Sequence, residues 1–308
     1  MGKSLLSYFS ENNPGLQKVI LLSRHPEKLD DVFKRKNFPF EIDYIAHDIQ
    51  ESVKFQEPVD YIIHAAAESS TSVGVNNPML MRDVVVEGTK NVLEYARQQK
   101  VKRMLFISSG AVYGKQPSDL SHIPEDYAGA PESLNPLNAY GCAKRQAENL
   151  CTLYNHRYSV DFVVARCFAF VGPYLPLNAH FAIGNFIRDG LSGGPIIVKG
   201  DGSTIRSYLY ADDLAEWLWT ILMKGKTGQA YNVGSDEAIT IVDLAHLVSS
   251  SFDSKPEVFI KGKLASEVNR YVPDIGKVKN ELGVLVRTAL LYGINKTITF
   301  NNKKIKVP

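Results

Sequence analysis

The chain has 308 residues, of which 44% are hydrophobic and 22% charged, and its formal net charge is +2. These proportions are typical of a globular protein and exclude extensive disorder and fibrous repeats. The balanced charge does not indicate binding to nucleic acid or to an anionic membrane, and no apolar run approaches the roughly 20 residues of a membrane span. The first 20 residues lack the apolar segment of a secretory signal, and the three cysteines form neither a disulfide framework nor a metal-ligand spacing. We therefore expect a cytoplasmic protein without a metal site.

The first half of the chain alternates strand-like and helix-like segments. Short runs rich in branched apolar residues, typical of buried parallel strands, occupy residues 18–22, 40–45, 59–64, 102–108 and 160–165. Apolar residues at helical spacing predict helices over 79–99 and 139–158. Because strands alternate with helices, we predict a doubly wound α/β domain whose parallel sheet is covered on both faces.

After residue 172 this alternation is lost. A loop rich in Pro and Gly is followed by shorter elements, with helices predicted over 182–191, 212–223 and 240–250 and a strand over 195–198. We predict that this part of the chain caps the sheet and does not fold independently.

The sharpest local motif is Tyr140-Gly141-Cys142-Ala143-Lys144. A spacing of four in a helix places the phenol and the ammonium on one face, one turn apart. A cation within about 4–6 Å lowers the pKa of a tyrosine by roughly 1–3 units, so the pair makes Tyr140 a candidate proton acceptor. The motif alone is weak, because surface pairs with this spacing are common.

A second motif, Ser108-Ser109-Gly110-Ala111-Val112-Tyr113-Gly114, begins where the predicted strand 102–108 ends. Small hydroxyl residues at the carboxyl end of a parallel strand lie beside the crevice in which open α/β sheets bind ligands. There Ser109 can hydrogen-bond a substrate alcohol whose proton Tyr140 removes. Alone the segment is also compatible with a Ser/Gly turn, but the two motifs in this order favour a catalytic site.

Together these residues resemble the extended short-chain dehydrogenases that act on nucleotide sugars, the epimerase/dehydratase group. The resemblance extends over nearly the whole chain and includes His64-Ala65-Ala66-Ala67, Arg166 to Gly172-Pro173, Gly200-Asp201-Gly202, Arg206-Ser207-Tyr208, Asp212-Asp213 and Tyr231-Asn232-Val233-Gly234. It implies a Rossmann-like fold in which residues 1–171 and 207–234 bind a dinucleotide and residues 172–206 and 235–308 form a substrate-binding cap. It also implies a homodimer formed through the helices over 79–99 and 139–158.

The resemblance implies that bound NAD, or NADP, takes a hydride from C4 of a sugar. Tyr140 would be the acid/base, Lys144 would lower its pKa and hold the nicotinamide ribose, and Ser109 would orient the hydroxyl. Further cofactor contacts are implied for Gly2, Ser23, Arg24, Asp48, Ile49, His64, Ala65 and Ala66, and substrate contacts for Ser109, Gly110, Ala111, Ala169 and Arg206. Arg206 matches an arginine that binds the substrate diphosphate, although a surface charge is the alternative. Arg24 can pair with a 2′-phosphate, which is why NADP stays open. For His64, a core histidine with satisfied hydrogen bonds is an equally good interpretation.

The sequence departs from the family pattern in its cofactor fingerprint. The Gly-x-x-Gly-x-x-Gly turn after a first strand is absent, and Gly2 is similar to its third glycine, so the chain resembles a late start. We expect a gap in the sheet where the first strand would lie, and impaired cofactor binding. Gly2-Lys3-Ser4 also matches the end of a P-loop, but the glycine and strand that should precede it are missing.

Other departures bear on the reaction. Gly110 and Ala111 stand where sugar 4,6-dehydratases carry an acidic pair, and Ala169 and Val85 replace asparagines that are usual in relatives. Without carboxyls, elimination lacks its acid and base, so C4 epimerisation is favoured, with dehydration or reduction of a keto sugar as alternatives. From other classes, a non-catalytic remnant that binds a sugar nucleotide stays open, whereas a regulator that senses dinucleotide is disfavoured by the intact Ser109, Tyr140 and Lys144.

Overall fold

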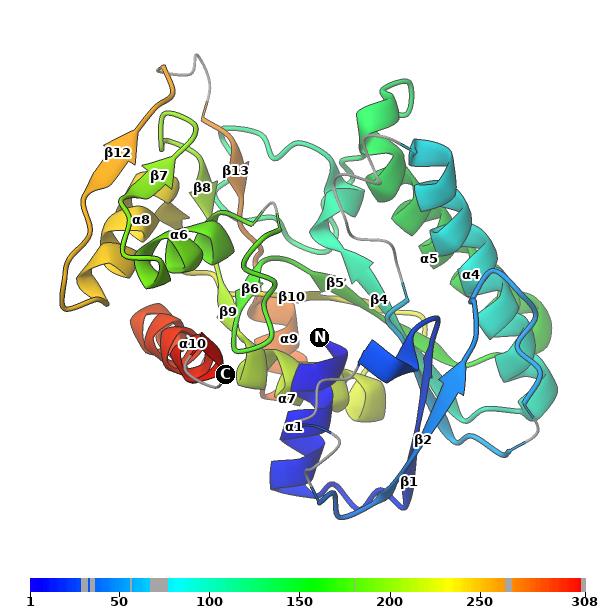
Figure 1. The fold of residues 1–308 in the computed structure, drawn as a ribbon. Helices are drawn as coiled ribbons and strands as arrows, with labels where there is room; N and C mark the ends of the chain where they lie inside the picture. Colours follow the sequence, from blue (N-terminus) through cyan, green and yellow to red (C-terminus); the bar gives the residue numbers. More distant parts are fainter. Residues whose placement is uncertain are drawn as a thin grey trace.

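A computed structural model of the chain is shown in Figure 1, and it describes residues 1–28, 33, 37–55, 57–66, 77–179, 181–263 and 268–305. Its centre is a parallel sheet of four strands in the order β10-β5-β4-β3. These strands are β3 (Tyr61–His64), β4 (Arg103–Ser109), β5 (Phe162–Cys167) and β10 (Ala230–Val233). The strands predicted over 59–64, 102–108 and 160–165 are thereby confirmed.

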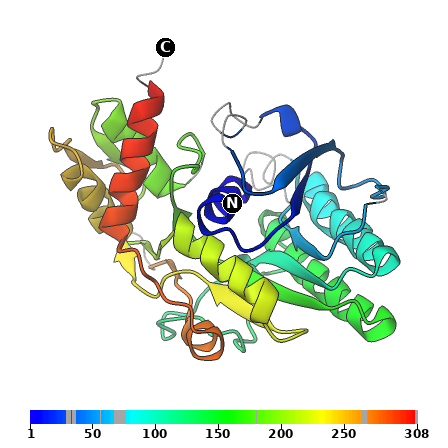
Figure 2. The same ribbon diagram turned by 90° about the horizontal axis from the view of Figure 1, so that it is seen from below.

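Helices cover both faces of this sheet. On one face lie α4 (Pro78–Gln99) and α5 (Ala139–Tyr158), and on the other lie α1 (Gly2–Asn12) and α7 (Ala211–Lys224), which are side by side in Figure 2. Side chains alternate along a strand, so Met104 and Phe106 of β4 pack under α4 and α5, while Leu105 and Ile107 pack with α1 and α7. This arrangement confirms the predicted doubly wound α/β fold.

The parallel sheet is interrupted beyond β3. Strands β1 (Lys18–Ser23) and β2 (Glu41–Ala46) form a separate parallel pair, and within the described residues β1 is paired only with β2 and β3 only with β4. Leu5, Leu6 and Phe9 of α1 belong to the same apolar cluster as side chains of β1, β2 and β4. Apolar packing, not backbone hydrogen bonding, therefore joins the two sheets, and the expected gap is confirmed.

The second half of the chain contributes α6 (Ala182–Leu191), α8 (Ile241–Ser250) and α10 (Leu290–Ile305) around a parallel pair, β7 (Ile196–Val198) and β12 (Val258–Ile260). Apolar side chains of these helices and of β7 form a cluster of their own. The elements themselves lie together at the left of Figure 1. The division into a dinucleotide-binding part and a cap remains a prediction, and this separate cluster favours it.

Short elements connect the two parts. Strands β11 (Ile239–Thr240), β8 (Ile205–Arg206) and β13 (Arg270–Tyr271) form a three-stranded sheet, β6 (Phe170–Val171) pairs with β9 (Leu209–Tyr210), and α9 (Gly276–Leu282) packs against β10. None of the helices in the described ranges is long and apolar enough to cross a membrane. In the same ranges, no group of three or more His, Cys, Asp or Glu side chains is arranged to hold a metal ion.

Candidate active site

The site begins at the carboxyl end of β4, where Ser109 is the last residue of the strand. Ser109 also caps the short 3-10 helix η2 (Gly110–Tyr113), because its Oγ accepts a hydrogen bond from the backbone N–H of Ala111 at 3.2 Å. Its neighbour across the sheet is Cys167, the last residue of β5. A hydroxyl is therefore held at the edge of the sheet where ligands bind in this class of fold.

Helix α5 brings Tyr140 to this serine. Tyr140 lies in the first turn of α5, and the next residue, Gly141, permits close contact with η2, because a Cβ there would lie 2.6 Å from the backbone oxygen of Ala111. The Ser109 hydroxyl is close enough to Tyr140 to lower the pKa of its phenol. The close packing of α5 on η2 therefore explains why residue 141 is a glycine. The structure brings the hydroxyls of Tyr140 and Ser109 together, as the sequence predicts.

Lys144 lies one turn further along α5 and is almost fully buried, with 2% of its surface exposed. Its Nζ donates to the backbone oxygen of Ile107 at 2.7 Å and lies 4.7 Å from the centre of the Phe106 ring. Burial lowers the pKa of Lys144 to about 8, although Cys167 and Glu148 act in the opposite direction. At neutral pH the site therefore holds a buried cation.

The pKa of Tyr140 differs from the prediction. Burial raises it to about 12, and the influence of Ser109 only partly opposes this effect. Lys144 Nζ lies 5.8 Å from the centre of the Tyr140 ring and donates to the backbone oxygen of Ile107, and Lys144 is not among the groups that shift the pKa of Tyr140. The prediction that Lys144 lowers the pKa of Tyr140 is wrong for this geometry, and Tyr140 carries its proton at neutral pH.

An ion pair behind the site was not singled out from the sequence. Glu148, one turn after Lys144, accepts hydrogen bonds from Ser108 Oγ at 2.6 Å and from Arg166 Nη2 at 2.7 Å. Arg166 also donates to the Tyr113 hydroxyl at 2.9 Å. These contacts fix α5 to β4 and β5, and the spacing of four between Lys144 and Glu148 is the signal that could have identified Glu148.

A shallow polar cavity of about 300 Å³, largely open to solvent, lies at the carboxyl ends of β1 and β2 and is lined by Arg24, Ala46, His47, Asp48 and Glu51. Arg24 and Asp48 were both predicted to contact the cofactor. Ile49, also predicted to contact the cofactor, is already engaged within the protein. Its side chain is buried against Gly88, and its backbone oxygen accepts a hydrogen bond from Asn91.

The remaining predicted cofactor residues lie apart from this cavity lining. The Ser23 hydroxyl accepts from the backbone N–H of His25 at 3.3 Å. Gly2 is exposed at the first position of α1. Ala65 is exposed and Ala66 half-buried after β3, whereas Ala67 lies outside the described residues. Contacts of these residues with a cofactor stay predictions.

His64, at the end of β3, is buried and hydrogen-bonded through its Nε2. Its Nε2 lies 3.0 Å from the hydroxyl of Thr89, which donates to the backbone oxygen of Val85 at 2.6 Å. Burial lowers the pKa of His64 to about 3, and the charge on Lys144 adds to this effect. A neutral histidine that ties β3 to α4 is the interpretation this geometry favours.

On the substrate side, Arg206 of β8 donates to the backbone oxygen of Ile205 at 2.8 Å, and burial lowers its pKa. Among the described residues no carboxylate lies within 4 Å of its guanidinium. A partly desolvated arginine without an acidic partner suits an anionic ligand such as a diphosphate. Gly110 is buried, Ala111 and Ala169 are half-buried, and none of the three supplies a carboxylate.

The residues present fit a dinucleotide in their chemistry, because Arg24 and Asp48 line a polar cavity at the ends of β1 and β2 and Lys144 is a buried cation beside β4. A family model described as the NAD dependent epimerase/dehydratase family matches residues 1–234. The chain belongs to this family.

Two curated relatives show the range of reactions in the family. UDP-glucuronic acid decarboxylase 1 of Danio rerio is 31% identical over 262 residues, which are 85% of this chain and 61% of that protein. A probable dTDP-glucose 4,6-dehydratase of Sinorhizobium fredii is 30% identical over 270 residues, 81% of this chain and 74% of that protein. The chain thus spans about three fifths of the length of the first relative.

Solved structures show the same fold. A UDP-glucose 4-epimerase of Thermotoga maritima with UDP-glucose has a TM-score of 0.83 at 22% identity, covering 99% of this chain and 96% of that one. A dTDP-glucose 4,6-dehydratase of Bacillus anthracis in complex with NAD has a TM-score of 0.79 at 22% identity, covering 98% and 93%. The predicted Rossmann-like fold is confirmed.

Proposed function

We propose that this chain is an NAD(P)-dependent nucleotide-sugar epimerase that oxidises the C4 hydroxyl of the sugar. The observation that carries the proposal is the meeting of Ser109, Tyr140 and Lys144 at the carboxyl end of β4. The relatives named above act on nucleotide sugars, and the guanidinium of Arg206 suits the diphosphate of such a substrate.

When bound, NAD(P) supplies the hydride acceptor. Arg24 and Asp48 would hold its adenosine end, and Lys144 would hold the nicotinamide ribose. Ser109 orients the sugar hydroxyl, and Tyr140 Oη takes its proton during oxidation and returns a proton to the carbonyl oxygen during reduction. Since Tyr140 is protonated at neutral pH, it must release that proton to water before it acts as a base, and the influence of Ser109, which lowers the pKa of Tyr140, makes this release easier.

The lack of carboxylates beside Ser109 favours epimerisation over elimination. Position 110 is a glycine and position 111 an alanine, and the carboxylate of Glu148 is engaged by Ser108 and Arg166. Within the described residues, no carboxylate is among the groups that shift the pKa of Tyr140. Transfer of a hydride from C4 and back to it requires only the three residues that are present.

A second candidate function is decarboxylation of a nucleotide-linked uronic acid, favoured by the similarity to a UDP-glucuronic acid decarboxylase. Oxidation of such a sugar at C4 gives a β-keto acid, which loses carbon dioxide without a carboxylate base. The same three residues could therefore carry the oxidation, and the substrate decides between the two reactions.

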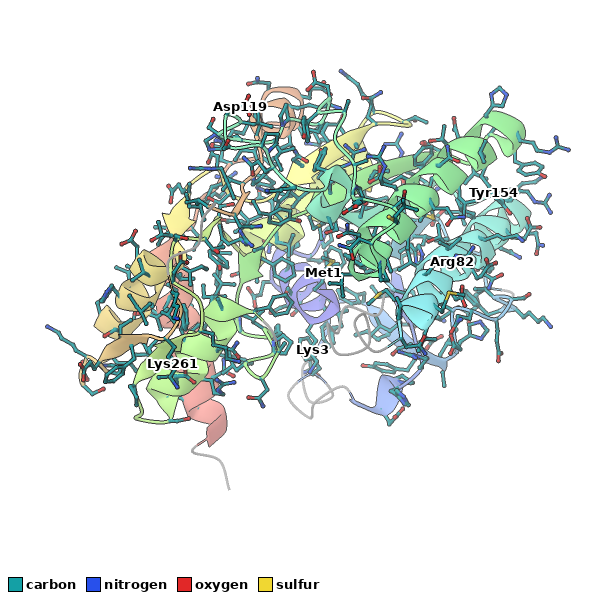
Figure 3. All side chains as sticks on the ribbon, turned by 90° about the horizontal axis from the view of Figure 1, so that it is seen from above. Met1, Lys3, Arg82, Asp119, Tyr154 and Lys261 are labelled. Carbon is teal, nitrogen blue, oxygen red and sulfur yellow. The ribbon has the colours of Figure 1, made fainter. Side chains whose placement is uncertain are left out.

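We also propose that the protein forms a homodimer through α4 and α5. These two helices lie side by side in Figure 3, where Arg82 marks α4 and Tyr154 marks α5. Large apolar side chains are exposed on these helices: Met79 is 68% exposed, Leu153 52% and Tyr158 45%. Burying them in a partner's equivalent surface would remove apolar area from water. The cytoplasmic location remains a prediction.

The test is to incubate the protein with NAD or NADP and with UDP-glucose, dTDP-glucose or UDP-glucuronic acid, and to identify the products by chromatography and mass spectrometry. A C4 epimer supports the first proposal, and release of carbon dioxide with a nucleotide pentose supports the second. A 4-keto-6-deoxy sugar contradicts both, and binding without turnover indicates the non-catalytic remnant. Tyr140→Phe should abolish turnover while leaving binding of the nucleotide sugar nearly unchanged, whereas Tyr61→Phe, at the start of β3, should retain turnover.

A further inference from the structure

The cavity at the ends of β1 and β2 has the chemistry to distinguish NADP from NAD. The two cofactors differ by one phosphate, which NADP carries on the 2′ oxygen of its adenosine ribose. In doubly wound folds, an Asp or Glu near this ribose accepts hydrogen bonds from the hydroxyls of NAD, whereas an Arg accommodates the 2′-phosphate of NADP. The residues that follow β1 therefore bear on which cofactor the cavity favours.

Strand β1 ends without a carboxylate. Its last residue is Ser23, which Arg24 and His25 follow. The first acidic side chain after the strand is Glu27, and its Oε1 lies 3.2 Å from Nδ1 of His25. The Ser23 hydroxyl accepts from the backbone N–H of His25 at 3.3 Å, so its single proton is left to donate to an oxygen of a ligand. The end of β1 thus offers a donor and not an acceptor.

Arg24 adds a cation to this donor. Of the five residues that line the cavity, Arg24 alone carries a permanent positive charge. Ser23 lies opposite Ala46 in the parallel pairing of β1 with β2, and the backbone N–H of His47 donates to the Ser23 backbone oxygen at 3.0 Å. This pairing fixes the backbone from which Arg24 extends. A guanidinium can donate to two oxygens of one phosphate at once.

Two carboxylates in the cavity lining oppose the binding of an anion. Asp48 Oδ1 accepts from the backbone N–H of Gln50 at 3.0 Å, in the turn after β2. This carboxylate therefore belongs to the other strand of the pair, and its second oxygen can accept from the amino group of adenine. Glu51 is exposed, so solvent and salt screen its charge. The end of β1 remains the place for a phosphate.

We propose that the cavity selects NADP over NAD, with Arg24 and the Ser23 hydroxyl holding the 2′-phosphate. The inference rests on the proposed function, since it names the cofactor of that enzyme. It concerns only the adenosine end of the cofactor, however, and requires no reaction of a sugar.

The first test is to measure the affinity for each cofactor by isothermal titration calorimetry. NADP should bind at least tenfold more tightly than NAD, which is about the worth of one hydrogen bond to a charged group. In Arg24→Gln, the affinity for NADP should fall at least tenfold, whereas that for NAD should be nearly unchanged. The matched control is Lys54→Gln, which removes an exposed positive charge outside the cavity lining and should leave both affinities nearly unchanged. Equal affinities of the wild type for the two cofactors, or tighter binding of NAD, would overturn the inference.

A second variant, Ser23→Asp, places a carboxylate at the end of β1. The carboxylate repels a 2′-phosphate and accepts from the ribose hydroxyls, so NAD should become the more tightly bound cofactor. A Ser23→Asp protein that keeps the preference for NADP would contradict the assignment of the phosphate to this strand end. Circular dichroism and thermal melting of each variant show that the fold is retained.

Adenosine fragments separate this inference from the proposed function, because they lack the nicotinamide and allow no turnover. The isomers 2′,5′-ADP and 3′,5′-ADP have the same charge and differ only in the position of one phosphate. The protein should bind 2′,5′-ADP at least tenfold more tightly than 3′,5′-ADP, and Arg24→Gln should remove this difference. If no sugar is turned over but the difference is present, the proposed function fails and the inference stands. Equal affinities for the two isomers, or no binding of 2′,5′-ADP, would refute the inference whatever the activity.

Discussion

Replacement of Lys144 by methionine should stabilise the protein at neutral pH, although it removes a residue of the candidate site. The ordinary pKa of a lysine is 10.5, and burial lowers that of Lys144 to about 8. By linkage, this difference corresponds to roughly 3 kcal/mol of free energy that the folded state loses by keeping the buried ammonium charged. Methionine has a similar length and no charge, so it removes this cost.

The loss of one hydrogen bond opposes this gain. Lys144 Nζ donates to the backbone oxygen of Ile107 at 2.7 Å, and leaving that oxygen without a donor costs about 1 kcal/mol. The net expectation at pH 7 is that the free energy of unfolding of Lys144→Met exceeds that of the wild type by about 2 kcal/mol.

The pH dependence of unfolding is an independent check that Lys144→Met stabilises the protein at neutral pH. Below pH 8 both folded and unfolded wild-type chains carry the ammonium, so the full cost applies. Between pH 8 and 10.5 the folded state releases the proton while the unfolded state keeps it, so wild-type stability rises with pH. The advantage of Lys144→Met should therefore shrink across this range and reverse above it, where only the missing hydrogen bond remains.

Urea unfolding followed by the fluorescence of Trp217 and Trp219, from pH 6 to about pH 10, measures this difference. Lys199→Met, which replaces an exposed lysine, should show no comparable trend. A Lys144→Met variant that is less stable than the wild type at pH 7, or whose difference from it is constant with pH, would refute the reasoning.

Two further predictions concern the position of α5. Gly141→Ala places a methyl group 2.6 Å from the backbone oxygen of Ala111, so α5 must move away from η2. We expect turnover to fall at least tenfold, although alanine stabilises the helix by about 0.5–1 kcal/mol relative to glycine. Wild-type turnover in steady-state kinetics would contradict this prediction. Glu148→Gln leaves the Arg166 guanidinium, whose side chain is 17% exposed, without its carboxylate. Thermal unfolding should then show a loss of roughly 3 kcal/mol, and an unchanged melting temperature would exclude the ion pair as a support of α5.

Regular segments with strong periodicity were the predictable part of this molecule. The helix expected over 139–158 begins and ends where α5 does, and the one over 182–191 coincides with α6. The interruption of the sheet also followed from the sequence, because the glycine-rich turn that accompanies a first strand is absent. In each case the signal is local, carried by residues within a few turns of one another.

The failures involve contacts between distant residues. Glu148 is contacted by Ser108 from β4 and by Arg166 from β5, and no periodicity in the sequence relates these residues. The pKa of Tyr140 was mispredicted because helical spacing shows only that Lys144 shares its face. The acceptor of the Lys144 ammonium is set by the backbone of β4, because the oxygen of Ile107 lies 2.7 Å from Nζ.

The separation of β1 and β2 from the main sheet has a consequence for local unfolding. Because apolar side chains and not a ladder of backbone hydrogen bonds attach this ribbon, it can open as a cooperative unit without disrupting the four central strands. Arg24 and Asp48 are carried on it, so the binding energy of a nucleotide in their cavity would be spent partly on keeping the ribbon closed. Occupancy of that cavity and amide-exchange protection of β1 and β2 are then two measures of one equilibrium.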